Sequence, residues 1–90
     1  MQYVYFLISL NDHRLYIGTS SDLNNRLEKH NSGYVLATKN RRPLKLLYYE
    51  SYTEISDAKR REKYLKGGRG HNELKIQIQD ALIKNNYKFI

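Results

Sequence analysis

The sequence predicts an α/β (α+β) sandwich in which helices flank a three-stranded, largely antiparallel β-sheet, in the order β-β-α-β-α-α. Residues 3–8, 15–19 and 44–52 are rich in aliphatic, β-branched and aromatic side chains, which is typical of strands. Two further segments space their apolar residues as helices do, and each ends at a glycine. The chain has 90 residues, so we expect residues 1–90 to form a single domain.

The first two strands form a predicted hairpin over residues 3–19. The run YVYFLI, residues 3–8, is apolar or aromatic throughout, as in a strand that is covered on both faces. The stretch SLNDHR carries turn residues, and LYIG then resumes the strand pattern. We expect a two-residue turn at Asn11 and Asp12, because both residue types tolerate positive φ.

A helix is predicted from about residue 21 to residue 31, where capping residues precede the segment and Gly33 follows it. Two leucines, four residues apart, form its apolar stripe. Arg26 and His30 have the same spacing and lie along the edge of that stripe. An arginine can bind a phosphate and a histidine can relay a proton, but both also suit a solvated helix surface.

The remaining elements are predicted from shorter signals. Residues 33–43 form an irregular basic connection, and residues 44–52 form the third strand. Thr53 is the predicted cap of a helix over residues 54–66, which a glycine pair terminates.

The C-terminal part begins with GGRGHN, which we expect to be a flexible basic loop. The segment ELKIQIQDALIKN then predicts a third helix, since apolar residues recur at helical spacing at Leu74, Ile78, Ala81 and Leu82. The alternation in KIQIQ leaves a strand as an alternative.

Charge and composition indicate the class of partner. Sixteen Lys and Arg against nine Asp and Glu give a net charge of +7, which favours nucleic acid as a ligand. The absence of cysteine excludes disulfides, thiolate zinc sites and cysteine nucleophiles. No apolar run approaches the ~20 residues that span a bilayer, and no secretory signal is recognisable. We therefore expect a cytoplasmic protein that does not engage a membrane.

Glu62 is an anomaly in the second predicted helix. It shares one face with Ile55, Ala58 and Leu65, so a carboxylate lies within an apolar stripe. Such a carboxylate is costly unless it is paired, hydrogen-bonded or bound to a metal ion. The helix pattern alone favours an ion pair; the alternative is a Mg²⁺ site completed by water and substrate phosphate.

Tyr5 and Tyr16 share a face of the sheet only if the hairpin loop has an even number of residues. The two-residue turn pairs Tyr5 with Gly18 and makes Tyr16 a diagonal neighbour on that face. Gly18 leaves open space beside Tyr5. Aromatic packing is the commoner use of such a pair, and a catalytic use requires reactive groups opposite the phenols.

Four segments resemble the GIY-YIG nuclease domain family in order and spacing: YVY, LYIGTSSDLNNRLEKHNSG, RRPLKLLYYE and AKRREKYLKG. They extend over about residues 3–75 and look most like small stand-alone members related to the nuclease domain of the bacterial excision-repair endonuclease. The first motif departs from the family pattern, because Tyr3 and Val4 replace its glycine and isoleucine. The resemblance implies metal-dependent hydrolysis of phosphodiester bonds.

The resemblance also implies a role for each site residue. Tyr5 matches the tyrosine that ends the first motif, and Tyr16 matches the one that opens the second. Arg26 matches the arginine that contacts the scissile phosphate, and His30 matches the histidine one turn later. Glu62 matches the metal-binding glutamate, so metal ligation becomes its expected role in place of an ion pair.

Asn72 is a further candidate, since many family members place an asparagine at the site. We expect it in a loop, where it would also serve as a helix N-cap.

The implied chemistry uses Mg²⁺ or Mn²⁺ on Glu62, charge neutralisation by Arg26 and a tyrosine that activates water. We expect Tyr5 to be the base, Tyr16 to orient water or phosphate, and His30 to support them by a hydrogen bond. A phenol with a pKa near 10 is a poor base at neutral pH, so nearby positive charge is expected to lower that pKa.

The expected substrate is DNA, with RNA also compatible, cleaved structure-selectively or with weak specificity in repair or recombination. Five cations are predicted to contact the phosphate backbone: Lys39, Arg41, Arg42, Lys66 and Arg69. Larger family members carry a separate DNA-binding domain that these residues do not contain, so a protein partner could supply specificity. The alternative is a catalytically weak nucleic-acid-binding accessory module that retains the fold. The oligomeric state is not predicted.

Overall fold

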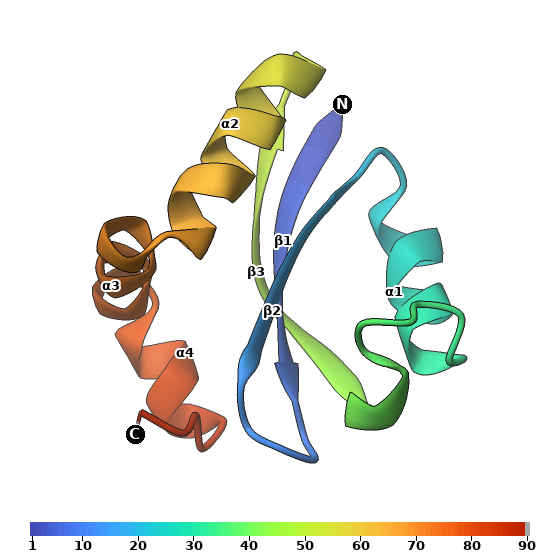
Figure 1. Cartoon of the computed structure of the whole chain (residues 1–90), viewed down its shortest axis with the longest axis vertical. Coiled ribbons are helices and arrows are strands. Elements are labelled where there is room, and N and C mark those ends of the chain that lie inside the picture. Colours follow the sequence, from blue (N-terminus) through green and yellow to red (C-terminus); the bar gives the residue numbers. More distant parts are fainter. Residues whose placement is uncertain (90) are drawn as a thin grey trace.

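The computed structural model describes residues 1–89 and contains a three-stranded antiparallel sheet in the order β2-β1-β3 (Figure 1). The central strand β1 (Gln2–Ser9) pairs with β2 (Leu15–Ser20) and with β3 (Leu44–Tyr52). Residues 4–9 of β1 are all buried, which explains why residues 4–8 are apolar or aromatic on both faces of the strand. The predicted α+β class and antiparallel sheet are confirmed.

The predicted register of the hairpin is also confirmed. Tyr5 is paired with Gly18, and Leu7 is paired with Tyr16. Tyr5 and Tyr16 are therefore diagonal neighbours on one face of the sheet, as the parity argument required.

The predicted two-residue turn at Asn11 and Asp12 is wrong. Ser9 and Arg14 close a longer loop of four residues, with a backbone N···O distance of 3.0 Å, and His13 adopts the positive φ of 58°. The Ser9 hydroxyl stabilises this loop by accepting hydrogen bonds from the backbone N–H groups of Asn11 and Asp12. The register survives because the longer loop also has an even number of residues.

Helices cover both faces of the sheet (Figure 1). Helix α1 (Leu23–Asn31) lies on one face, which we call the α1 face. Helices α2 (Ile55–Lys66), α3 (Gly68–Gln77) and α4 (Gln79–Lys84) lie on the other, the α2 face. A short 3-10 helix, η1 (Lys39–Arg41), precedes β3. No helix within residues 1–89 combines the length and apolar character needed to cross a lipid bilayer.

Each face has its own apolar core, and alternate residues of β1 supply the two. The larger core, on the α2 face, consists of Val4, Phe6, Ile17, Ala58, Leu65, Leu74, Ile78 and Leu82. The smaller core, on the α1 face, consists of Tyr5, Leu7 and Leu44, against which the α1 residues Leu23 and Leu27 pack. Tyr5 thus belongs to the smaller core, on the α1 face.

The two long helices begin differently. The side chain of Asp22 caps α1 by accepting a hydrogen bond from the N–H of Asn25, and Gly33 follows the helix with a φ of 85°. The predicted cap of α2, Thr53, is wrong by one residue. The N-cap is Glu54, and its side chain makes no capping hydrogen bond.

The prediction of a flexible loop at GGRGHN is wrong, because α3 begins at Gly68. Gly70 lies against the end of α2, and a Cβ there would come within 2.1 Å of the carbonyl oxygen of Tyr64. This glycine therefore permits a close helix–helix contact. The C-terminal segment forms α3 and α4 rather than one helix or a strand, so the element order is β-β-α-β-α-α-α.

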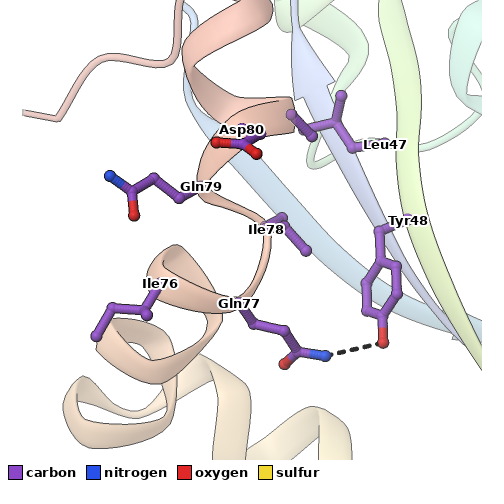
Figure 2. Close-up of a pocket in the computed structure, with 8 residues that line it drawn as sticks. Leu47, Tyr48, Ile76, Gln77, Ile78, Gln79 and Asp80 are labelled. Atoms are coloured by element: carbon purple, nitrogen blue, oxygen red, sulfur yellow. Dashed lines mark hydrogen bonds between the residues drawn. The ribbon is translucent and has the colours of Figure 1, made fainter.

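The junction of α3 and α4 at Ile78 borders a hollow of about 440 Å³ against β3, lined by Leu47, Tyr48 and residues 76–81 (Figure 2). The side chain of Gln77 donates a hydrogen bond of 2.9 Å to the Tyr48 hydroxyl (Figure 2). This hollow belongs to the α2 face, opposite Tyr5.

Candidate active site

Tyr5 extends its phenol across the neighbouring strand β2. A Cβ at Gly18 would lie 2.5 Å from the Tyr5 hydroxyl and 3.1 Å from the ring of Tyr16. Only glycine at this position leaves room for the buried ring, and Tyr5 is 1% exposed. The open space expected beside Gly18 is therefore filled by Tyr5 itself.

A directed chain of hydrogen bonds starts at this phenol. The Tyr5 hydroxyl lies 2.8 Å from Nε2 of the fully buried His30 and accepts a bond of 3.2 Å from Nε of Arg26. We assign Tyr5 as the donor to Nε2, because a second donor beside Arg26 would leave the proton of this buried phenol without an acceptor. Nδ1 of His30 then carries the ring proton and donates at 2.7 Å to Oγ1 of Thr38, whose hydroxyl donates to the carbonyl of Val35. We call Tyr5, Arg26, His30 and Thr38 the Tyr5 cluster.

Burial controls protonation in this cluster. Burial, reinforced by the Arg26 guanidinium, lowers the pKa of His30 to about 4, so the imidazole is neutral at neutral pH. Burial also raises the pKa of Tyr5, and this effect exceeds the opposing hydrogen bond from Arg26. Arg26 lowers the pKa of Tyr5 as expected, but the expected net decrease is wrong, because desolvation is the larger effect and the pKa is raised overall.

Arg26 and Tyr16 complete the α1 side of the site, and both are half-buried. The Tyr16 ring lies with its centroid 6.3 Å from that of Tyr5 and 5.0 Å from that of His30. The hydrogen bond to Tyr5 raises the pKa of Arg26, which keeps the guanidinium charged. Arg26 forms no ion pair with any other residue in the range 1–89. The site thus presents a positive charge without a carboxylate partner.

The apolar face predicted for α2 is narrower than the sequence suggested. Ala58 and Leu65 are buried, whereas Ile55 is 60% exposed. Glu62 lies at the margin of this face, and its side chain is 17% exposed. The carboxylate is therefore only partly desolvated.

Glu62 lies on the α2 face, but its lysine neighbours place it beside the edge strand β2. Nζ of Lys59 donates a 2.8 Å hydrogen bond to Thr19, and Lys66 lines a hollow of about 250 Å³ together with Tyr16. After burial and the neighbouring phenol, the charge of Glu62 contributes to the raised pKa of Tyr5. Residues from both faces thus approach one another around β2.

Glu62 can hold a metal ion only if other groups supply the remaining oxygen ligands. Its carboxylate lies 3.0 Å from Nζ of Lys66 and 3.9 Å from Nζ of Lys59. In the part of the chain that the structure describes, no three His, Cys, Asp or Glu side chains are grouped to hold a metal. Mg²⁺ nevertheless binds through one carboxylate when waters and substrate phosphate complete its shell. Glu62 fits such a site, because both lysines have exposed, flexible side chains.

Comparison with known proteins gives the family. The model of the GIY-YIG catalytic domain matches residues 1–75. The chain belongs to the GIY-YIG family. It is 40% identical over 77 residues to the UPF0213 protein SERP0126 of Staphylococcus epidermidis, covering 84% of this chain and 93% of the relative. It is 33% identical over 89 residues to the UPF0213 protein CPE1444 of Clostridium perfringens, covering 98% and 95%.

The solution NMR structure of the UPF0213 protein BH0048 from Bacillus halodurans has the same architecture. It superposes with a TM-score of 0.54 at 28% identity, covering 99% of this chain and 97% of that chain. The chain is therefore a small member of a nuclease family, and the GIY-YIG resemblance of its motifs is confirmed.

Arg41 was predicted to contact nucleic acid, but its side chain is bound to the β1–β2 hairpin. Its Nε lies 2.6 Å from Asp12, and Nη2 donates to the carbonyl oxygens of Arg14 and Leu15. The hydrogen bond from Arg41 lowers the pKa of Asp12. This guanidinium therefore fixes the connection before β3 to the turn between β1 and β2.

Lys39 and Arg42 are exposed near the C-terminal end of α1. Nε of Arg42 donates to the carbonyl oxygen of Lys39, and its guanidinium lies against Gly33, 2.9 Å from where a Cβ would be. These two cations remain available on the α1 side of the GIY-YIG domain.

Two other predicted cations lie on the α2 side, where acidic side chains accompany them. Lys66 pairs with Glu62, and Arg69 lies 4.0 Å from Glu73. Asn72 is exposed within α3, so its expected position in a loop or at an N-cap is wrong.

Thr38 is a site residue that the sequence did not predict. It is fully buried, and its hydroxyl is the partner of His30. The segment around Thr38 is basic and polar, as exposed turns are, so the local sequence does not indicate that Thr38 is buried against His30. Only the fold, which places the connection against α1, reveals it.

Proposed function

We propose that this GIY-YIG protein is a metal-dependent endonuclease that hydrolyses phosphodiester bonds in DNA. The observation that carries the proposal is the Arg26 guanidinium, which is half-buried beside two phenols and has no carboxylate partner within residues 1–89. A phosphate would supply the missing negative charge through two parallel hydrogen bonds. Arg26 then stabilises the charge that develops on the non-bridging oxygens during attack.

The Tyr5 cluster provides a route for the proton of the attacking water. As the water oxygen forms its bond to phosphorus, its proton passes to the Tyr5 oxygen, and the Tyr5 proton passes to Nε2 of His30. The bond from phosphorus to the leaving 3′-oxygen breaks. Tyr5 therefore acts as the base without first becoming a phenolate, which its raised pKa disfavours at neutral pH.

Tyr16 orients the water or the phosphate, since it is half-buried and lies beside both Tyr5 and His30. Thr38 holds the His30 ring so that Nε2 faces Tyr5 with a free lone pair. An anionic phosphate beside Arg26 would also favour the protonated imidazole that the transfer produces.

Glu62 would hold Mg²⁺ or Mn²⁺, with waters and substrate oxygens as the further ligands. When bound, the metal supplies Lewis-acid stabilisation of the phosphate and of the leaving oxygen. With a metal ion on Glu62, the exposed amines of Lys59 and Lys66 would pair with neighbouring phosphates instead of the carboxylate.

The basic surface favours DNA over a neutral substrate, given the net charge of +7. Lys39, Arg42, Lys66 and Arg69 contact the backbone without reading sequence, which fits weak specificity and a role in repair or recombination. Arg41 and Asn72 contribute less, because Arg41 is bound within the hairpin and Asn72 lies on α3. RNA is a competing substrate, and a partner protein would add selectivity.

The test compares Glu62→Gln with Glu54→Gln, an exposed carboxylate at the start of the same helix. Cleavage of plasmid, duplex, branched and single-stranded oligonucleotides is measured with Mg²⁺ and with Mn²⁺. Glu62→Gln should lose about 10²–10³-fold or more in rate, whereas Glu54→Gln should cleave like the wild type. A wild type that cleaves no better than Glu62→Gln on all four substrates refutes the nuclease function.

One observation favours a second function, a nucleic-acid-binding accessory module with weak catalysis. Both carboxylate oxygens of Glu62 are engaged by lysines, so a metal ion has to displace these ion pairs. This alternative predicts salt-dependent DNA binding that Glu62→Gln leaves intact or strengthens, without cleavage by the wild type.

A further inference from the structure

Tyr34 and Leu36 are the two most exposed large apolar side chains among residues 1–89, at 82% and 88%. They flank Val35, which is buried. Two such side chains within three residues form a local apolar feature rather than isolated surface residues.

The segment that carries them is anchored to the active site. The backbone N–H of Tyr34 donates to the carbonyl of Lys29 on α1 at 3.0 Å, and that of Thr38 donates to Val35 at 3.1 Å. The Thr38 side chain then contacts His30. Tyr34 and Leu36 therefore have fixed backbone positions beside the C-terminal end of α1, where Figure 1 shows this connection.

The charge around this pair indicates what it meets. From residue 29 to residue 49 the chain contains five lysines and arginines and no acidic residue. Lys29, Lys39 and Arg42 are exposed and form no ion pair within the described chain. Apolar side chains surrounded by unpaired cations suit a ligand that offers both phosphates and flat apolar faces, which a nucleic-acid strand does.

Spacing along α1 relates the pair to the phosphate that would be cleaved. The end of α1 lies on the order of 10 Å from Arg26, at ~1.5 Å per residue plus the turn that follows. In the stacked geometry of a duplex, successive nucleotides of one strand are ~3.4 Å apart along the axis. The bases that reach Tyr34 and Leu36 are thus about two to three nucleotides from Arg26.

We propose that Tyr34 and Leu36 bind an unpaired base, Tyr34 by stacking on it and Leu36 by covering its edge or the adjoining base step. This inference rests on the proposed function, and it names the substrate class as nucleic acid with unpaired bases next to the cleaved bond. The faces of bases within a continuous duplex are already stacked, so a phenol gains contact only at a gap, a branch or a single strand. Apolar wedges of the size of leucine act at base steps in the same way.

The experiment measures binding without cleavage, using the full chain in EDTA. Two fluorescent duplexes of one sequence are compared, one continuous and one with a short gap that contains 2-aminopurine. Tyr34→Ala and Leu36→Ala should each weaken binding to the gapped duplex, Tyr34→Ala by roughly tenfold, and leave binding to the continuous duplex unchanged. Tyr34→Phe should keep the affinity and the quenching of 2-aminopurine. Ile76→Ala, which truncates an equally apolar side chain that is 74% exposed on α3, is the matched control.

Equal weakening on both duplexes, or no effect on either, refutes the proposal; the second result would instead fit a protein partner on this surface. Failure of the nuclease function gives a different result. In that case Mg²⁺ produces no cleavage, while the preference for the gapped duplex and its dependence on Tyr34 persist in EDTA.

Discussion

Two clusters of tyrosine and arginine lie on opposite faces of the same sheet, and they handle charge differently. On the α2 face, the carboxylate of Glu50 accepts hydrogen bonds from the hydroxyls of Tyr48 and Tyr52, at 3.2 and 2.7 Å. Arg61 donates to both oxygens of the same carboxylate, at 3.0 and 3.2 Å. In this Glu50 cluster the arginine charge is neutralised within the protein.

On the α1 face the Tyr5 cluster replaces the carboxylate with an imidazole. His30 is neutral, so it accepts the proton of Tyr5 but does not compensate the charge of Arg26. Burial, then the hydrogen bond and charge of Glu50, raise the pKa of Tyr52 to about 12, which keeps that phenol a permanent donor. The comparison shows that an arginine beside phenols does not by itself make a site. Only the cluster whose charge is left unbalanced is available to an anionic substrate.

Removing each arginine in turn should give the largest difference between the two clusters. Arg26→Ala should lower kcat/KM for DNA cleavage by about 10²–10³-fold with little change in Tm, since its charge acts on the substrate. Arg61→Ala should leave the folded enzyme active but cost about 2 kcal/mol of stability, because Glu50 and its phenols keep an uncompensated charge that solvent partly screens. A thermal melt and a cleavage assay on both variants separate the effects.

Arg60→Ala is the matched control, because among residues 1–89 this exposed arginine pairs only with Asp57, on the same helix. It should change stability by less than about 0.5 kcal/mol. If Arg26→Ala melts well below the wild type, or if Arg61→Ala loses activity while folded, the assignment of one cluster to catalysis and the other to stability is wrong.

The two clusters should also respond to different ranges of pH. The pKa of His30 is about 4 in the folded chain against 6.5 when unperturbed, so below 6.5 the unfolded chain binds a proton that the folded chain does not. Stability should therefore decrease as pH is lowered through this range, by up to about 3 kcal/mol. For Glu50, burial opposes but hydrogen bonds from Arg61 and Tyr52 prevail, so its pKa lies below 4.5. The contribution of Glu50 to stability is present above pH 4.5, and it is lost only as the pH falls through the lower pKa that Glu50 has in the folded chain.

Urea unfolding between about pH 7 and about pH 5 thus reports mainly on His30. The His30→Gln variant, which has no group titrating in this range at that position, should show a flatter dependence on pH. An equal decrease in the variant and the wild type would show that the imidazole of His30 is not held neutral by the fold.

The sequence predicts those parts of the site whose residues lie close together along the chain. Tyr5, Tyr16, Arg26 and His30 come from a hairpin and the helix that follows it, so strand alternation and helical spacing determine most of their arrangement. The register was predictable even though the turn was not, because only the parity of the loop affects which face each tyrosine occupies.

The remaining features depend on contacts between distant segments, which local patterns do not encode. Glu50 precedes Arg61 by eleven residues on another element, and nothing in the sequence indicated their part-buried ion pair, because the helix pattern drew attention only to Glu62. Gly70 looked like part of a flexible loop because its contact with Tyr64 exists only once α2 and α3 pack. Burial reversed the expected direction of the Tyr5 pKa for the same reason.

Substitutions of Thr38 should have the smallest effects, and they test whether this residue of the Tyr5 cluster supports catalysis or only packing. Thr38→Val keeps the shape of the side chain but removes the acceptor of the Nδ1 proton of His30, which is fully buried. The ring should then shift toward the tautomer with the proton on Nε2, so Tyr5 loses its proton acceptor. We expect cleavage to slow by about tenfold and stability to decrease by ~1–2 kcal/mol. Thr38→Ser, which keeps the hydroxyl, should restore both.

The readout that packing alone would not change is the tautomer of His30, measured from the ¹⁵N chemical shifts of its ring by NMR. In the wild type and in Thr38→Ser the proton should lie on Nδ1, and in Thr38→Val a population with the proton on Nε2 should appear. If Thr38→Val loses stability while its ¹⁵N shifts and cleavage rate match the wild type, Thr38 only fills space. The proton path from Tyr5 to Nε2 of His30 would then stand without the Thr38 hydroxyl, and burial of the ring beside Arg26 would be sufficient to hold the imidazole neutral.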